Sequence, residues 1–171
     1  TGISVRQVDE HLVRRSRLVV ELRNVPFEQQ RQILFYVVDR LPRFAAGKMD
    51  ATGNGAYLAE VAAQRYGARI EQVKLSTEWY RENMPPWKAA FEDGTITLPR
   101  HADILADLRT VRLINGVAQV PRDARVTGAD GGQRHGDFAV ADVLCHAATR
   151  GDVPDYGYIP ATAPPGTAEA E

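Results

Sequence analysis

Between residues 28 and 75 the sequence alternates between helical and extended patterns, and this alternation constrains the fold more than any other feature. Residues 28–41 carry apolar side chains at helical spacing, and residues 56–66 do the same. The short run 47–50 and the apolar residues within 70–75 each predict a strand. The order helix, strand, glycine turn, helix, strand predicts an α/β fold in which helices cover a sheet.

Two hairpins are predicted outside this segment. Extended runs at residues 3–5 and 18–22 indicate a β-ribbon near the start of the chain. Asn115-Gly116 lies between two short apolar runs and is the strongest hairpin signal in the sequence, because this dipeptide suits the turn that joins two antiparallel strands.

The remaining helices divide the chain into a domain and a tail. Residues 76–94 predict a helix that Pro85-Pro86 kinks or interrupts, and residues 137–149 predict the last helix. Beyond Gly151 the composition turns to Pro, Gly, Ala and Thr without apolar periodicity. We therefore expect one domain over residues 1–150 and a flexible tail over 151–171.

Composition narrows the class of protein further. The 171 residues are 44% hydrophobic and 25% charged, which is typical of one globular domain and excludes wholesale disorder. With 21 basic and 22 acidic side chains, the net charge of −1 argues against nucleic-acid binding by bulk charge alone. A single cysteine, Cys145, excludes an internal disulfide framework and favours a reducing, cytoplasmic setting. We interpret Cys145 as a small core residue.

The segment from Met49 to Gly55 is the most informative local feature. It places Asp50 at the carboxyl end of a predicted strand, where α/β folds bind ligands, followed by glycines that allow a sharp turn. The alternative is that Asp50 only caps the turn before the next helix. A nucleotide-binding P-loop is excluded around Lys48, because the pattern requires glycine where Pro42 stands and Ser or Thr at Met49.

A second feature, Arg134-His135-Gly136-Asp137, lies at the start of the last predicted helix. Asp137 is either an ordinary helix N-cap or a ligand for a divalent cation, with His135 and Arg134 then close to a substrate phosphate. Asp50 and Asp137 together offer hard oxygen ligands, which suit Mg²⁺ or Mn²⁺ rather than Zn²⁺. Two such ions form a clamp for phosphodiester hydrolysis.

Two further acids, Asp103 and Asp107, are four residues apart in a short predicted helix. If this segment is helical the two carboxylates repel each other modestly, so we assign both to a solvent-facing surface.

A set of ordered motifs resembles the large terminases of Mu-type bacteriophages. The similarity runs from residue 18 to 150, through the segment from Val19 to Phe27, the Asp50 turn, the segment from Ala90 to Gly94, Asp107-Leu108-Arg109 and His135-Gly136-Asp137. Each motif alone is weak, and their order and spacing make the match specific.

The resemblance implies the C-terminal RNase H-like nuclease domain of that family, with a central mixed sheet flanked by helices and an extra β-hairpin. It implies a metal-dependent endonuclease that cuts double-stranded viral DNA with little sequence preference, using two Mg²⁺ or Mn²⁺ ions. By matching motif, Asp50 and Asp137 correspond to metal ligands, and His135 accompanies the last acid as a catalytic residue. We expect Lys48, Arg122 and Arg134 to contact DNA phosphates.

The resemblance also implies what lies outside the chain. The family's first acid precedes the segment that begins at Thr1, and so does the motor domain, so we expect a fragment or processed product whose isolated activity is weak or absent. The implied partners are DNA, that motor domain, a portal and a small terminase subunit, in the host cytoplasm and without a membrane. Two other functions stay open: a nucleotide-binding domain that uses the Asp50–Gly55 loop, and a non-catalytic assembly module that docks through its tail.

Overall fold

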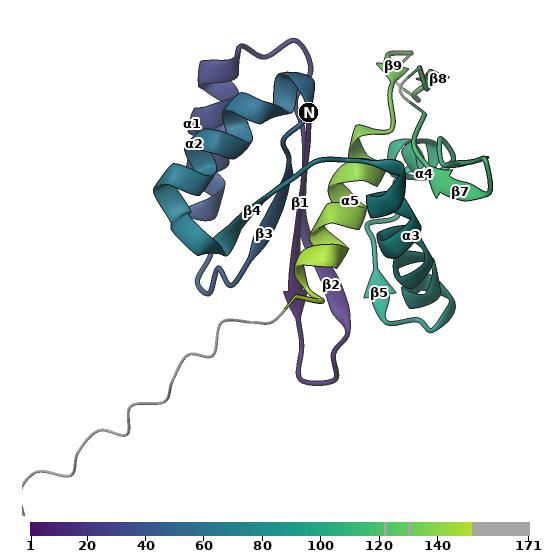
Figure 1. Cartoon of the computed structure of the whole chain (residues 1–171), viewed down its shortest axis with the longest axis horizontal. Helices are drawn as coiled ribbons and strands as arrows, with labels where there is room; N and C mark the ends of the chain where they lie inside the picture. Colours follow the sequence, from purple (N-terminus) through teal and green to yellow (C-terminus); the bar gives the residue numbers. More distant parts are fainter. Residues whose placement is uncertain (122, 130, 152–171) are drawn as a thin grey trace, which may run out of the picture.

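The structure, a computed structural model, describes residues 1–121, 123–129 and 131–151, and Figure 1 shows its arrangement. Fourteen helices and strands occur in these ranges, together with two short 3-10 turns. In chain order they are β1 (Gly2–Val8), β2 (Arg14–Glu21), α1 (Phe27–Val38), β3 (Gly47–Asp50), α2 (Ala56–Tyr66), β4 (Ile70–Val73), α3 (Thr77–Glu92), β5 (Ile96–Thr97), α4 (Ala102–Leu108), β6 (Arg112–Ile114), β7 (Val117–Gln119), β8 (Val126–Thr127), β9 (Gln133–Arg134) and α5 (Asp137–Ala148). The predicted tail lies outside the described residues after Gly151, as does Arg122.

The α/β class predicted from the sequence is confirmed, but the strands are distributed over several small sheets. β1 and β2 form an antiparallel hairpin, and β5 joins β2 in parallel, which gives a mixed three-stranded sheet. β3 and β4 form a separate parallel pair, and β6–β7 and β8–β9 form two short antiparallel pairs. The expected single central sheet is therefore divided in the described residues.

Local sequence signals account for most element boundaries. α2 and β3 match their predicted ranges, and the β6–β7 turn places Asn115 and Gly116 at positive φ (51° and 78°), as the hairpin signal predicts. α3 continues as one helix through Pro85 and Pro86, so of the two predicted effects of these prolines the interruption does not occur. Its apolar side chains hold it in place, since Tyr80, Met84, Trp87 and Ala90 are all buried in one core cluster.

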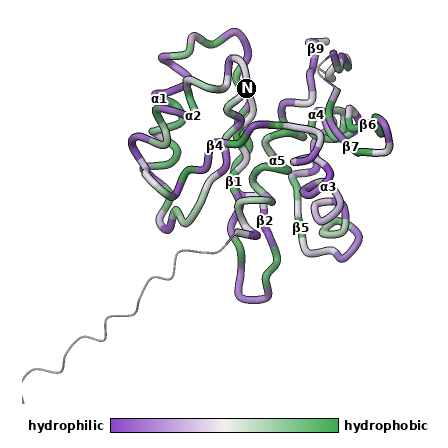
Figure 2. The backbone as a smooth tube through the Cα atoms, viewed as in Figure 1, coloured by the Kyte–Doolittle hydropathy of each residue, from purple (hydrophilic) through white to green (hydrophobic). Residues whose placement is uncertain are grey.

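α5 is the central element of the molecule. It carries predominantly apolar residues (Figure 2) and packs against β1, β3, α3 and α4. Figure 1 shows it between one half formed by α1, α2, β3 and β4 and another formed by α3 and α4. A separate core cluster fills the first half with Leu34, Val38, Ala62, Tyr66 and Ile70. None of the helices in the described ranges is long and apolar enough to cross a bilayer.

Candidate functional site

Asp50 is the last residue of β3 and is partly buried. The backbone N–H and the hydroxyl of Thr52 both donate to its Oδ1, at 2.8 and 2.6 Å. The turn that follows depends on glycine, because a Cβ on Gly55 would lie 2.4 Å from the carbonyl oxygen of Asp50. The turn therefore fixes the orientation of the carboxylate at the end of the strand. This agrees with the alternative in which Asp50 caps the turn. The second oxygen, Oδ2, takes no part in these two bonds.

Asp137 is the first residue of α5, and the residue before it makes this position possible. Gly136 has φ +77°, and a Cβ there would lie 2.4 Å from Thr110 Oγ1 and 2.7 Å from Val120 Cγ1. The helix N-cap is therefore Gly136, and Asp137 does not cap the helix with its own side chain. Its carboxylate is 51% exposed and accepts a hydrogen bond from the Thr1 ammonium at 2.9 Å.

Asp50 and Asp137 lie at the same end of the molecule. Figure 1 shows the end of β3, the start of α5 and the N-terminus of the chain at this end. Thr1 links the start of α5 to α1, because its nitrogen contacts Asp137 and its hydroxyl donates to Oε1 of Gln30 at 2.8 Å. Residues 87 positions apart in the sequence are thus brought to one end by β3 and α5, which pack against each other. The described ranges contain no group of three or more His, Cys, Asp or Glu placed to hold a metal ion.

The guanidinium of Arg134 is occupied by carboxylates instead of facing solvent. Arg134 is 3% exposed, with Nε 3.0 Å from Asp107 Oδ1 and Nη1 3.4 Å from Asp103 Oδ2, and Nη2 pairs with Glu21. Burial alone would lower the pKa of Arg134, but these carboxylates, Asp107 foremost, raise it overall. A phosphate would reach this side chain only after these ion pairs opened, and the phosphate contact of Arg134 stays a prediction.

Asp107 was assigned to a solvent-facing surface from the sequence, and it is instead 2% exposed. Its Oδ1 accepts from Arg134, and its Oδ2 accepts from the backbone N–H of Phe138 at 2.9 Å. It thereby satisfies a free N–H group in the first turn of α5, directly beside Asp137. The helical spacing of Asp103 and Asp107 gave no signal for this role, because both partners come from beyond residue 130.

Of the other residues predicted to contact the substrate, the structure describes His135 and Lys48, which differ in how exposed and how well paired they are. His135 is exposed, and its Nδ1 lies 2.7 Å from Arg125 Nη1 and 3.3 Å from the carbonyl oxygen of Ala124. Lys48 pairs with Glu71 on the neighbouring strand and keeps only 17% of its side chain exposed. Arg122, the third predicted phosphate contact, lies outside the described residues.

A second charged cluster lies inside the molecule, under the middle of α5. Asp142 and Arg6 form an ion pair whose two side chains are fully buried. Ser4 Oγ and Trp87 Nε1 also donate to the Asp142 carboxylate, at 3.2 and 3.0 Å. Burial raises the pKa of Asp142, and it raises the pKa of the nearby Cys145 thiol to about 11, so this cysteine stays uncharged at neutral pH. No pattern in the sequence indicated this cluster.

The chain is homologous to the large terminase subunit gp28 of Mu. It is 47% identical over 129 residues to the probable terminase large subunit gp28 of Escherichia phage Mu, covering 75% of this chain and 23% of that protein. It is 39% identical over 158 residues to the Mu-like prophage FluMu protein gp28 of Haemophilus influenzae, covering 92% of this chain and 31% of that protein. The chain therefore spans about a quarter to a third of the length of these curated relatives. No family model and no solved structure matches it.

Proposed function

We propose that this chain is the nuclease part of a Mu-like phage large terminase subunit, a divalent-metal-dependent endonuclease that hydrolyses double-stranded DNA with little sequence preference. The observation that carries the proposal is the position of Asp50 and Asp137 at one end of the molecule, at the end of β3 and the start of α5. The homology to gp28 supports the terminase part of the proposal, because 92% of this chain aligns with the FluMu gp28 protein.

The chemistry of the donor groups agrees with Mg²⁺ or Mn²⁺. Both ions prefer carboxylate oxygen ligands. Because the two hydrogen bonds from Thr52 occupy Oδ1 of Asp50, we propose Oδ2 as the atom that binds the ion. The Asp137 carboxylate is half exposed at the start of α5, so a metal ion can reach it from solvent. A pair of such ions, when bound, lowers the pKa of an attacking water and stabilises the departing oxygen of the cleaved bond.

The two aspartates do not complete a metal site within the described residues, so a further acid is part of the proposal. The Thr1 nitrogen lies 2.9 Å from Asp137 Oδ2. The curated relatives are about three to four times as long as the segment that matches this chain. We propose that the first acid of the site precedes Thr1 in a protein of that length, together with the motor domain, and that the portal and small subunit bind the assembled protein in the host cytoplasm.

The protein's own residues around the aspartates have separable roles in this proposal. Asp107 and Arg134 fix the first turn of α5 and thereby position Asp137. His135 is exposed one residue before Gly136, where it reaches the substrate strand, and Arg125 beside it supplies positive charge for a phosphate. Lys48 is the weaker phosphate contact, because its charge is already paired with Glu71.

The test is Mn²⁺-dependent nicking of a supercoiled plasmid by the full-length large subunit. Asp50→Asn and Asp137→Asn should each lower the rate by more than the about 10–100-fold that outer-shell metal-site mutations cost. Asp93→Asn is the matched control, since it removes one exposed carboxylate at the end of α3 and should cut normally. Undiminished cutting by either site variant contradicts the role proposed for that residue. A thermal shift on the 171-residue chain alone tests the nucleotide-binding alternative, because the proposed motor domain is then absent; stabilisation by ATP instead of Mn²⁺ or DNA would indicate it.

A further inference from the structure

A pocket of about 710 Å³ opens at the other end of β3 from Asp50. It lies between the C-terminal ends of α1 and α2 and is closed by the loop that precedes β3. Its floor is apolar, with Leu41, Phe44 and Tyr66 among the lining residues. Phe44 lies three residues before β3 begins at Gly47, and Asp50 ends that strand, so about 10 Å of strand separates the pocket from the proposed nuclease end.

Arginine side chains surround this pocket and outnumber its acids. Asp39 is the carboxylate among the lining residues, and it is neutralised by Arg65 Nη2 at 2.7 Å and by the Tyr66 hydroxyl at 2.9 Å. These two hydrogen bonds lower the pKa of Asp39. Arg43 and Arg69 also line the pocket, are exposed, and have no ion-pair partner in the part of the chain that the structure describes. The rim therefore carries a surplus of positive charge.

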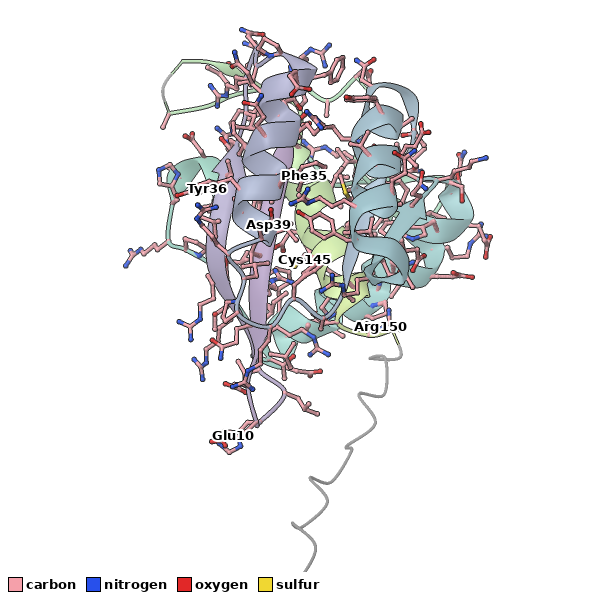
Figure 3. All side chains as sticks on the ribbon, turned by 90° about the vertical axis from the view of Figure 1, so that its left-hand side faces the viewer. Glu10, Phe35, Tyr36, Asp39, Cys145 and Arg150 are labelled. Carbon is pink, nitrogen blue, oxygen red and sulfur yellow. The ribbon has the colours of Figure 1, made fainter. Side chains whose placement is uncertain are left out.

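Aromatic rings alternate with these cations. Arg69 lies over the ring of Phe44 at 5.5 Å, and Phe44 meets Tyr66 edge to face with centroids 5.8 Å apart. On the adjoining surface Arg40 stacks on Tyr36 at 3.6 Å, and the Tyr36 side chain is 60% exposed. Figure 3 shows Phe35, Tyr36 and Asp39 on this face, which α1 and α2 form. Tyr66 is buried, Phe44 is half-buried and Tyr36 is exposed, so Phe44 and Tyr36 are the rings that a ligand can reach. Cations beside accessible aromatic rings are the combination that binds phosphates and stacked bases together.

We propose that this pocket binds single-stranded nucleic acid, with backbone phosphates at Arg43 and Arg69 and one unpaired base in the pocket against Phe44. An acidic peptide would use the arginines but not the ring of Phe44, and a duplex keeps its bases stacked and out of reach. The proposal goes beyond the nuclease function, because it concerns a different surface and needs neither Asp50 nor a metal ion.

The test measures binding of a fluorescently labelled oligothymidylate of about 12 nucleotides by anisotropy, in the presence of a chelator and across a salt series. The double variant Arg43→Ala/Arg69→Ala should weaken binding by about tenfold and reduce the slope of log affinity against log salt by about 1.4, the value for two single-strand phosphate contacts. Phe44→Leu keeps an apolar side chain but removes the ring, and should weaken binding about fivefold or more while changing the salt slope little.

The matched control is Arg81→Ala/Arg112→Ala, which removes two exposed arginines from α3 and β6 and should change affinity by less than about twofold. An equal loss in this control overturns the proposal, since it would show that net charge alone attracts the strand. Equally tight binding of the matching duplex, or of polyglutamate, also overturns it. Because the assay contains no free metal, its outcome is separate from that of the nicking experiment.

Discussion

Asp137 and Asp142 lie five residues apart on the same helix, yet their surroundings differ completely. Asp137 is half exposed at the first turn of α5 and contacts one cation, the Thr1 ammonium. Asp142 is fully buried and is held by Arg6, Ser4 and Trp87. An aspartate whose hydrogen-bonding capacity is filled by protein groups stabilises the fold, and one left accessible is available to a ligand. The comparison separates the interior of α5, which supports structure, from its first turn, which supports the proposed chemistry.

The largest expected effect comes from breaking the interior pair. Asp142→Asn leaves the buried guanidinium of Arg6 without its counter-charge, and we expect a loss of about 3–5 kcal/mol in the free energy of unfolding. The matched change Asp137→Asn on the exposed turn should stay within about 0.5 kcal/mol. Urea denaturation of both variants measures the difference. Equal losses would show that the two aspartates do not differ as their surroundings indicate.

A second prediction concerns the glycine at which α5 begins. Gly136→Ala adds a Cβ that meets Thr110 and Val120 at a residue with φ +77°, and we expect a loss of about 3 kcal/mol in unfolding free energy.

Gly53→Ala is the control in the turn after Asp50, where φ is +51° but nothing lies within 4 Å of the added Cβ. We expect Gly53→Ala to lower the free energy of unfolding by about 1 kcal/mol, which is the cost of the positive φ without a steric clash. If the two variants unfold at the same denaturant concentration, the steric account of the first turn of α5 is incorrect.

The interior of α5 also predicts a dependence on pH. His146 is 2% exposed, and burial, followed by the positive charge of Arg14, lowers its pKa from 6.5 to about 4. Between these values the unfolded chain binds the proton and the folded chain does not, so this residue makes stability fall as the pH falls from 6.5 towards 4. From pH 7 to pH 5 the expected loss is about 2 kcal/mol.

The measurement compares the protein with His146→Leu, because subtraction removes the contributions of all other titrating groups. The variant should lose correspondingly less stability between pH 7 and pH 5. Substitution of His11, whose side chain is 79% exposed, by Gln is the control for the loss of a histidine as such. A His146 variant that follows the parent at every pH would show that this imidazole titrates normally.

The smallest expected effect lies in the turn of the proposed site. Thr52→Val removes the hydroxyl that donates to Asp50 Oδ1 but keeps the backbone N–H bond, so we expect a loss of about 0.5–1 kcal/mol. Thermal denaturation at neutral pH measures this, and Thr52→Ser should restore most of the loss. A loss of stability as large as that of Asp142→Asn would show that this turn stabilises the fold as strongly as the interior of α5 does.

Much of the local structure was predictable from the sequence, because it depends on neighbouring residues. The helical spacing over 56–66 predicted α2, and Asn115-Gly116 predicted the β6–β7 hairpin. Asp50 was placed correctly at a strand end for the same reason, since a strand and the glycine turn after it are encoded within ten residues. The continuous helix through Pro85 and Pro86 was not predicted, because buried contacts of Trp87 and Met84 with distant residues outweigh the local preference.

The sequence by itself determined where elements such as α2, β3 and the β6–β7 hairpin form and end, because periodicity and glycine turns act over a few positions. Only the tertiary structure decided which charges are buried. Arg134 and Asp107 look like surface residues in the sequence, and they become interior partners because Glu21, Asp103 and the start of α5 converge on them. Charge pairing between residues 27 to 136 positions apart leaves no local pattern, since it depends on how the helices and strands pack.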